Sequence, residues 1–476
     1  MTQKELSQIL KLNNAAIIAP AGHGKTEMIV DIVKQSSGKQ LLLTHTHAGV
    51  DALKKRLDRK KVPHEKYSLS TIAGFCTKWG LAFFNTGEID KNLSPNSKKK
   101  ADRGRYYKQF YEGAKAIFSN QWAKEILKSS YSGIIVDEYQ DCTLTHHEIF
   151  HELNTFLPVI VLGDPLQGIF AFKEPIVDWN DLGYEIVSVD TYPWRWKYSN
   201  PKLGEYLAEV RTSLWPTLLG KNCTLDVNPC SGSISIIDPA SFKPYSLLDE
   251  LTEFKSVLYI TKWENQQLDF CKKMPGIFQL DEKQECKELF DFAKTFDNSS
   301  DAALALAIIL FESTCATKVK TELSSYINRL CSDSYDFKRI SKYPDFGELL
   351  IKVRGQNKYD AIRAICGWIE SNAEFKFCRK ELHNEMLHSV NYAENNDVSI
   401  EEAANRIRKD IPLQKRYTDF KFLSSRTLLS KGLEFDCVII DGQCDLTAKE
   451  FYVAMTRAMK KIYIIAPSSK ILLKPG

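Results

Sequence analysis

One short stretch of this chain combines glycines, a lysine and a hydroxyl at a spacing that suits phosphate binding. It reads Ala19-Pro20-Ala21-Gly22-His23-Gly24-Lys25-Thr26. The glycines allow the backbone to turn its N–H groups onto an anion, Lys25 would neutralise the β and γ phosphates, and the Thr26 hydroxyl would ligate Mg²⁺. A glycine-rich turn before an ordinary helix is the alternative interpretation. We predict a nucleotide-binding loop that uses Ala19, Ala21, Gly22, His23, Gly24, Lys25 and Thr26.

The residues around this loop predict the strand, loop and helix that it requires. Residues 15–18 are an apolar run typical of a buried parallel strand, and residues 27–33 show helical spacing. Gln8 precedes the strand at a distance that would let its amide reach an adenine edge. A surface helix position is an equally good interpretation of Gln8.

Two further apolar runs end in side chains that suit phosphate hydrolysis. Residues 133–136 lead into Asp137 and Glu138. Asp137 would hold Mg²⁺ through water, and Glu138 would orient and deprotonate the water that attacks the γ phosphate. Residues 159–162 lead, after a short turn, to Gln167, which is placed to sense the γ phosphate. In a parallel sheet these strand ends share one edge, where ligands bind.

Hydroxyls, imidazoles and aromatic rings follow the other predicted strands. They suit phosphate and base contacts along a single strand of nucleic acid, although the aromatic pair could equally be core residues. The predicted DNA contacts are Thr44, Thr46, His47, Thr71, Phe170 and Phe172. Residues 92–105 contain several lysines and precede two tyrosines. This composition favours a surface that binds nucleic acid and a solvent-exposed loop about equally.

The sequence His147-Glu148-Ile149-Phe150-His151 matches the H-E-x-x-H pattern of zinc proteases. On a helix this spacing puts two imidazoles on one face with a glutamate between them. No third ligand is evident from the sequence. Since the preceding strand already ends in the predicted hydrolytic carboxylates, we interpret the match as a coincidence.

Composition limits the class of protein. A chain of 476 residues is expected to form roughly two to four domains. The hydrophobic fraction of 43% and charged fraction of 26% are typical of soluble globular proteins, and a net charge of +4 permits a nucleic-acid partner without requiring one. Residues 1–10 lack a secretory signal, and the longest apolar run, residues 302–311, is too short to span a membrane.

The cysteines favour a reducing compartment. There are twelve, and none forms a C-x-x-C pair. We therefore predict reduced, mostly buried thiols in a cytoplasmic protein that has no membrane partner.

Six motifs occur in an order that resembles the UvrD/Rep branch of superfamily 1 helicases. They read A-P-A-G-H-G-K-T, T-H-T-H, D-E-Y-Q-D, G-D-P-L-Q-G-I-F-A-F, K-G-L-E-F-D near Lys431 and Y-V-A-M-T-R-A near Tyr452. The resemblance implies an α/β fold of two RecA-like parallel-sheet P-loop domains with small, mainly helical 1B-like and 2B-like insertions. It also implies ATP between the two domains, single-stranded or partly duplex DNA across them, and translocation from 3′ to 5′.

The resemblance assigns further residues to the nucleotide. Arg195 matches an arginine that reaches the γ phosphate, and Trp194 stands where the family has an adenine-stacking tyrosine. Glu434 matches the ribose contact, with Gly432 beside it, and Arg457 matches the second arginine finger. The expected catalytic set is Glu138, Gln167, Arg195 and Arg457.

The expected domain boundaries follow from the same motifs. Residues 1–75 and 133–184 would form the first RecA-like domain, and residues 185–282 and 410–476 the second. Residues 76–132 would form a compact 1B-like insertion, and residues 283–409 a helical 2B-like insertion.

Two functions agree with this organisation. The leading one is an ATP-dependent 3′ to 5′ DNA translocase or helicase. The other is a nucleotide-gated, DNA-sensing ATPase subunit that regulates a separately encoded nuclease, because compact UvrD-like proteins without a nuclease domain are similar to the helicase subunits of bacterial anti-phage systems such as Gabija. Unwinding by the single chain would favour the first function, and stimulated ATPase without unwinding the second.

Overall fold

The computed structural model describes residues 2–90, 100–170, 174–282, 286–410 and 420–476. The chain divides into two compact units, each described here by itself. The first contains residues 1–235, 446–462 and 468–476, and the second contains residues 236–445 and 463–467. The four-part division expected from the sequence stays a prediction.

The first unit is built on a six-stranded sheet with the order β3-β2-β4-β5-β1-β6. Every neighbouring pair in it is parallel. All carboxyl ends therefore lie along one edge, as the motif order predicts. The strands are β1 (Asn14–Ile18), β2 (Gln40–Thr44), β3 (Tyr67–Thr71), β4 (Gly133–Val136), β5 (Val159–Gly163) and β6 (Glu185–Val187).

Alternating side chains give this sheet two apolar faces, and helices cover both. Ala15, Ile17 and Leu42 belong to one core, which includes residues of helices α1, α2 and α3, whereas Ala16 and Leu41 belong to the other, which includes residues of α4, α5, α6 and α7. The helices are α1 (Gln3–Ile9), α2 (Lys25–Gln35), α3 (His47–Arg59), α4 (Ile72–Ala82), α5 (Lys100–Phe118), α6 (Gln121–Ser130) and α7 (Leu144–Asn154).

The first unit is completed by segments that are distant in sequence. Helix α8 (Pro201–Leu214) follows β6, and helix α19 (Ala448–Met455) comes from near the end of the chain. An antiparallel pair joins β7 (Cys223–Asp226) to β14 (Lys470–Leu473). Late residues therefore pack in the same unit as the predicted nucleotide loop.

The second unit contains most of another six-stranded sheet, with the order β10-β11-β9-β12-β13-β8. Its strands β10, β11, β9 and β12 pair in parallel. Their bounds are β8 (Ile234–Ile237), β9 (Val257–Thr261), β10 (Gln279–Leu280), β11 (Phe422–Arg426), β12 (Phe435–Asp441) and β13 (Ala458–Ile465), and the short helices beside them are α9 (Leu248–Thr252) and α10 (Glu264–Lys273). Two parallel-sheet α/β domains are thus present, which confirms the expected fold class.

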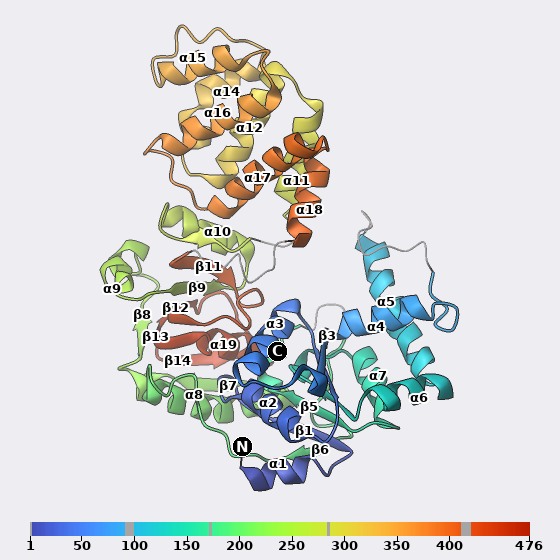
Figure 1. The fold of residues 1–476 in the computed structure, drawn as a ribbon. Helices are drawn as coiled ribbons and strands as arrows, with labels where there is room; N and C mark the ends of the chain where they lie inside the picture. The colour runs from blue at the N-terminus through green and yellow to red at the C-terminus, as the bar shows by residue number, and fades with distance from the viewer. Residues whose placement is uncertain (1, 91–99, 171–173, 283–285, 411–419) are drawn as a thin grey trace. The chain divides into compact units, whose positions relative to one another are not determined.

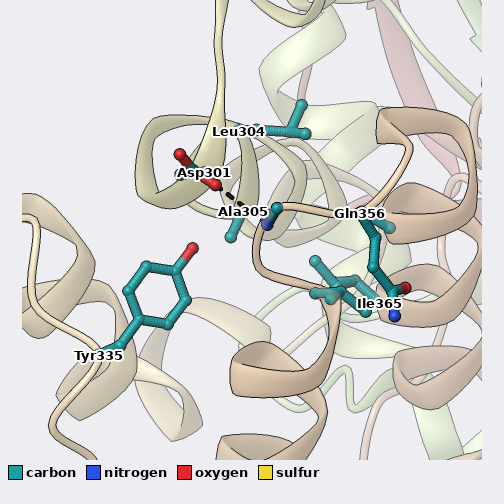
Figure 2. A pocket seen from close by; sticks show the side chains of 9 residues that line it. Asp301, Leu304, Ala305, Tyr335, Gln356 and Ile365 are labelled. Carbon is teal, nitrogen blue, oxygen red and sulfur yellow. Dashed lines mark hydrogen bonds between the residues drawn. The ribbon is translucent and has the colours of Figure 1, made fainter.

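Residues 286–410 of the second unit are helical and share one apolar core (Figure 1). Their helices are α11 (Lys287–Asn298), α12 (Asp301–Cys315), α13 (Val319–Glu322), α14 (Ser324–Cys331), α15 (Pro344–Val353), α16 (Lys358–Ser371), α17 (Lys380–Asn396) and α18 (Ile400–Asp410). A cavity of ≈ 20 Å³ lies among them, beside Asp301, whose carboxylate accepts the Gly355 N–H at 3.1 Å (Figure 2). That volume is large enough for about one water molecule.

All twelve cysteines are free thiols and ten of them are buried, as the sequence predicted. Among the described residues, no helix is long and apolar enough to cross a membrane.

Candidate nucleotide-binding site

The predicted nucleotide loop connects the carboxyl end of β1 to the first turn of α2. Gly22 has φ +70° and Gly24, the N-cap of the helix, has φ +87°. Both angles lie in the left-handed region, which glycine adopts without the steric penalty of other residues. The buried Lys25 ammonium donates to the Ala19 carbonyl over 3.2 Å. The loop thus has the curled backbone, helix N-terminus and lysine that a phosphate site needs.

Residues 191–200 pack directly on this loop, and its glycines make that approach possible. A Cβ atom on Gly22 would lie 2.7 Å from a ring carbon of Trp196. A Cβ atom on Gly24 would lie 3.2 Å from a ring carbon of Trp194. The glycines therefore serve two purposes, because they supply the left-handed turn and leave room for two indole rings.

Polar contacts join the same two segments. The Arg195 N–H donates to the Gly22 carbonyl over 3.1 Å. The Nδ1 atom of His23 lies 3.0 Å from the Thr191 hydroxyl. Burial, together with the charge of Lys25, lowers the pKa of His23 to about 4. His23 is therefore neutral near pH 7, and it adds no charge beside the lysine.

Residues 191–200 also bind the turn that follows α19. Arg195 Nη1 donates to the Thr456 carbonyl, and Trp196 Nε1 donates to the Ala458 carbonyl, both over 2.6 Å. Between these two carbonyls lies Arg457, which is buried and donates to the Thr456 hydroxyl over 3.0 Å. One segment therefore contacts both the nucleotide loop and the two residues that flank Arg457, the residue matched to the second arginine finger, although the loop and Arg457 are more than 400 positions apart.

Strand β4 delivers the two predicted hydrolytic carboxylates to the carboxyl edge of the first sheet. The Asp137 N–H donates to the Leu43 carbonyl of β2 over 2.9 Å, and the Asp137 carboxylate accepts the Glu138 N–H over 2.9 Å. Glu138 has φ +55°, a left-handed conformation that non-glycine residues seldom adopt. Backbone strain of this kind is concentrated at functional sites, so it supports a role for Glu138.

Asp164 directly follows strand β5, and four other residues donate hydrogen bonds to its completely buried carboxylate. It accepts the Ala21 N–H of the nucleotide loop at 3.2 Å, the Tyr452 hydroxyl of α19 at 3.2 Å, and Gln167 Nε2 at 3.4 Å. Arg211 of α8 donates its Nε–H at 3.1 Å and supplies a compensating charge. We call this set, Asp164 with Ala21, Gln167, Arg211 and Tyr452, the Asp164 junction.

The residues present fit a magnesium nucleotide. Thr26 lies in the first turn of α2 and Asp137 at the end of β4, and both supply the oxygen donors that Mg²⁺ prefers. Among the described residues, no cluster of three metal-ligating side chains occurs, so any Mg²⁺ would depend on phosphate and water for its other ligands.

The remaining predicted nucleotide contacts lie in several places. Gln8 is exposed on α1, and Trp194 is 55% exposed with its ring against Tyr192 and Lys197. Gly432 and Glu434 precede β12 in the second unit. Their assignment to the nucleotide stays a prediction.

The predicted DNA contacts occupy the carboxyl edge of the first sheet with different degrees of exposure. Thr44 and Thr71 are buried, whereas His47 is exposed and Phe170 is 37% exposed. The hydroxyls of Thr46 and Thr71 cap helices α3 and α4 by accepting backbone N–H groups, so part of their hydrogen-bonding capacity is already used. Phe172 lies outside the described residues.

The H-E-x-x-H residues lie on α7 of the first unit, where Glu148 and His151 are exposed and His147 is partly buried, and each has a partner within the unit. His147 Nδ1 lies 2.7 Å from the Tyr139 hydroxyl, and His151 Nε2 lies 3.3 Å from the Leu182 carbonyl. Glu148 pairs with Lys115 at 2.6 Å. These contacts agree with our interpretation that the zinc-protease match is a coincidence.

Comparison with known proteins gives one family match over the first third of the chain. Residues 3–173 match the model of an AAA domain, and they include the nucleotide loop, both β4 carboxylates and Gln167. No curated protein matches. A solved structure titled as the complex of arterivirus nonstructural protein 10 (helicase) with DNA is similar at 10% identity and a TM-score of 0.34. The similarity covers 98% of this chain and spans 63% of that chain. The residues that are similar to an AAA domain all lie in the first unit.

Sequence reasoning missed Asp164, Tyr452, Arg211 and Gln140 as parts of this site. Asp164, Tyr452 and Gln140 lie inside the quoted motifs, and an acid at a strand end was a usable indication. Arg211 lies in an ordinary amphipathic helix, and nothing in its neighbourhood marks it.

Proposed function

We propose that this chain is a DNA-stimulated ATP hydrolase that moves along single-stranded DNA from 3′ to 5′. The observation that best supports this proposal is that residues 191–200 contact both the nucleotide loop and the turn that follows α19. Arg195 contacts Gly22 of the nucleotide loop through its backbone and Thr456 through its guanidinium. A change at the γ phosphate can therefore reach residues near the end of the chain through a few hydrogen bonds.

Each polar group in the site has a proposed task. Lys25 and the loop N–H groups bind the phosphates, and Thr26 and Asp137 would hold Mg²⁺, which supplies charge neutralisation when bound. Glu138 orients the attacking water and takes its proton. Gln167 senses the γ phosphate.

Arg195 and Arg457 stabilise the charge that develops on the transferred phosphoryl group. Trp194 provides the surface on which the base stacks, and Gln8, Gly432 and Glu434 complete the nucleoside contacts.

The side chains at the carboxyl edge of the first sheet support our proposal that the chain binds nucleic acid. His47 and Phe170 are exposed there, beyond the ends of two parallel strands, where an imidazole and an aromatic ring could meet phosphates and bases. We further propose a cytoplasmic location, because twelve free thiols suit a reducing compartment.

The deciding experiment measures ATP turnover by the purified chain with and without single-stranded DNA. We expect stimulation by DNA, and loss of turnover in Lys25→Ala with the fold retained by circular dichroism. Absence of turnover in the wild-type chain, or retention of it in Lys25→Ala, would contradict the proposal.

An unwinding assay with 3′-tailed and 5′-tailed duplexes tests the movement. Unwinding from the 3′ tail supports a motor that acts alone. Stimulated ATPase without unwinding, changed by a neighbour-encoded nuclease, would instead identify the DNA-sensing subunit of a nuclease assembly such as those that defend bacteria against phages.

A further inference from the structure

Gln140 lies between the predicted catalytic base and the turn that carries Gln167. Its Nε2 donates to the Glu138 carboxylate, and its Oε1 accepts the Asp164 N–H over 3.0 Å. The side chain is 1% exposed. Gln140 thus uses both ends of its amide to connect the end of β4 to the end of β5.

Two glycines leave space for this residue. A Cβ atom on Gly163 would lie 2.5 Å from Gln140 Oε1, and one on Gly168 would lie 2.9 Å from the Gln140 carbonyl oxygen. These glycines flank the short 3₁₀ turn of residues 165–167. The turn that carries Gln167 therefore packs against Gln140. A residue larger than glycine at position 163 or 168 would displace either this turn or Gln140.

We propose that Gln140 is a positioning residue for ATP hydrolysis, which holds the Glu138 carboxylate at a set place relative to Gln167. This role rests on the function proposed above. The amide of Gln140 donates to one oxygen of the Glu138 carboxylate and so fixes the position of that oxygen. Asp164 also accepts the N–H of Ala21 in the nucleotide loop. Through Asp164, Gln140 therefore also fixes the position of the Glu138 carboxylate relative to the loop that would bind the phosphates.

The test compares two replacements of Gln140 in the full-length chain. Gln140→Met removes both hydrogen bonds at similar volume, and Gln140→Glu keeps the acceptor for the Asp164 N–H while losing the donor toward Glu138. For both we expect DNA-stimulated kcat to fall about 30- to 100-fold, because positioned proton transfer contributes roughly 100- to 10,000-fold to a rate. The KM for ATP should change less than about 3-fold, since the phosphate contacts remain.

Two controls separate this role from a purely structural one. Gln267→Met removes a glutamine that is equally buried and that donates to Ser424 at 2.6 Å in the second unit, so it should lower thermal stability without lowering kcat per folded molecule. In a Glu138→Gln background, Gln140→Met should lose most of its effect on the residual rate, because it acts through Glu138.

The results discriminate clearly. Equal losses of kcat in the Glu138 and Glu138→Gln backgrounds, or a fall in stability with unchanged kcat, would overturn the positioning role while leaving the ATPase intact. A wild-type chain without DNA-stimulated turnover would overturn the proposed function, and this role with it.

Discussion

From the contacts of the Asp164 junction we predict that Tyr452→Phe, which removes one hydroxyl, breaks the hydrogen-bonded connection between helix α19 and the nucleotide loop. Tyr452 is buried, and its hydroxyl donates to the Asp164 carboxylate over 3.2 Å. Burial and the nearby carboxylate raise the pKa of Tyr452 well above its usual 10, so the hydroxyl stays a donor in any ordinary assay. Its stabilising effect is therefore fully present below about pH 10 and is lost only above it.

The expected size follows from the contacts that remain. A hydrogen bond to a charged acceptor contributes about 1.5–3 kcal/mol. Asp164 keeps its other donors, including the guanidinium of Arg211, so the loss of unfolding free energy should lie near the lower limit, about 1.5 kcal/mol. Because Arg457 lies two residues after the end of α19, we expect kcat to fall about 10-fold, which corresponds to about 1.4 kcal/mol of barrier. ATP affinity should change little.

The assays are urea unfolding, steady-state ATPase and nucleotide binding, with Tyr259→Phe as the matched control. The Tyr259 hydroxyl also donates to an aspartate, Asp441, over 3.1 Å, but it does so in the second sheet. The control should lose stability with little change in kcat. If Tyr452→Phe keeps wild-type stability and turnover, or if both variants lose turnover equally, the reasoning about the junction is wrong.

Three further predictions concern the same site. Gly22→Ala should cost about 2–5 kcal/mol of stability and most of the turnover, because a left-handed alanine is strained and its Cβ meets Trp196, whereas Gly220→Ala, at φ +76° with open space around it, should cost only about 1–2 kcal/mol. His23→Gln should remove an acid-sensitive component of stability. Burial holds the pKa of His23 in the folded protein near 4, below the usual histidine value of about 6.5, so wild-type stability should fall by about 3 kcal/mol from this residue as pH drops from 6.5 to 4, measured by thermal unfolding across that range. Arg457→Ala should lower kcat far more than ATP affinity, because the phosphate contact that we propose for Arg457 would strengthen in the transition state; equal losses in turnover and in ATP binding would contradict that role.

The sequence alone was enough to predict the local parts of the site. The apolar run before the nucleotide loop became β1, and the helical spacing after it became α2. The run before Asp137 became β4, with the bounds that its composition indicated. Such elements are predictable because strand and helix periodicity is a property of neighbouring residues, and because parallel strands place their carboxyl ends on one edge.

The contacts between distant residues were decided only by the tertiary structure. Asp164 and Tyr452 are 288 positions apart, and Arg195 and Thr456 are 261 apart. No local pattern reports which buried donor will meet a given acceptor, because that depends on how α8 and α19 pack against the first sheet. The sequence determined which groups could take part in phosphate chemistry. The packing decided that a buried carboxylate would require an arginine and a tyrosine from elsewhere, since a charge removed from water is stable only when its hydrogen bonds are satisfied.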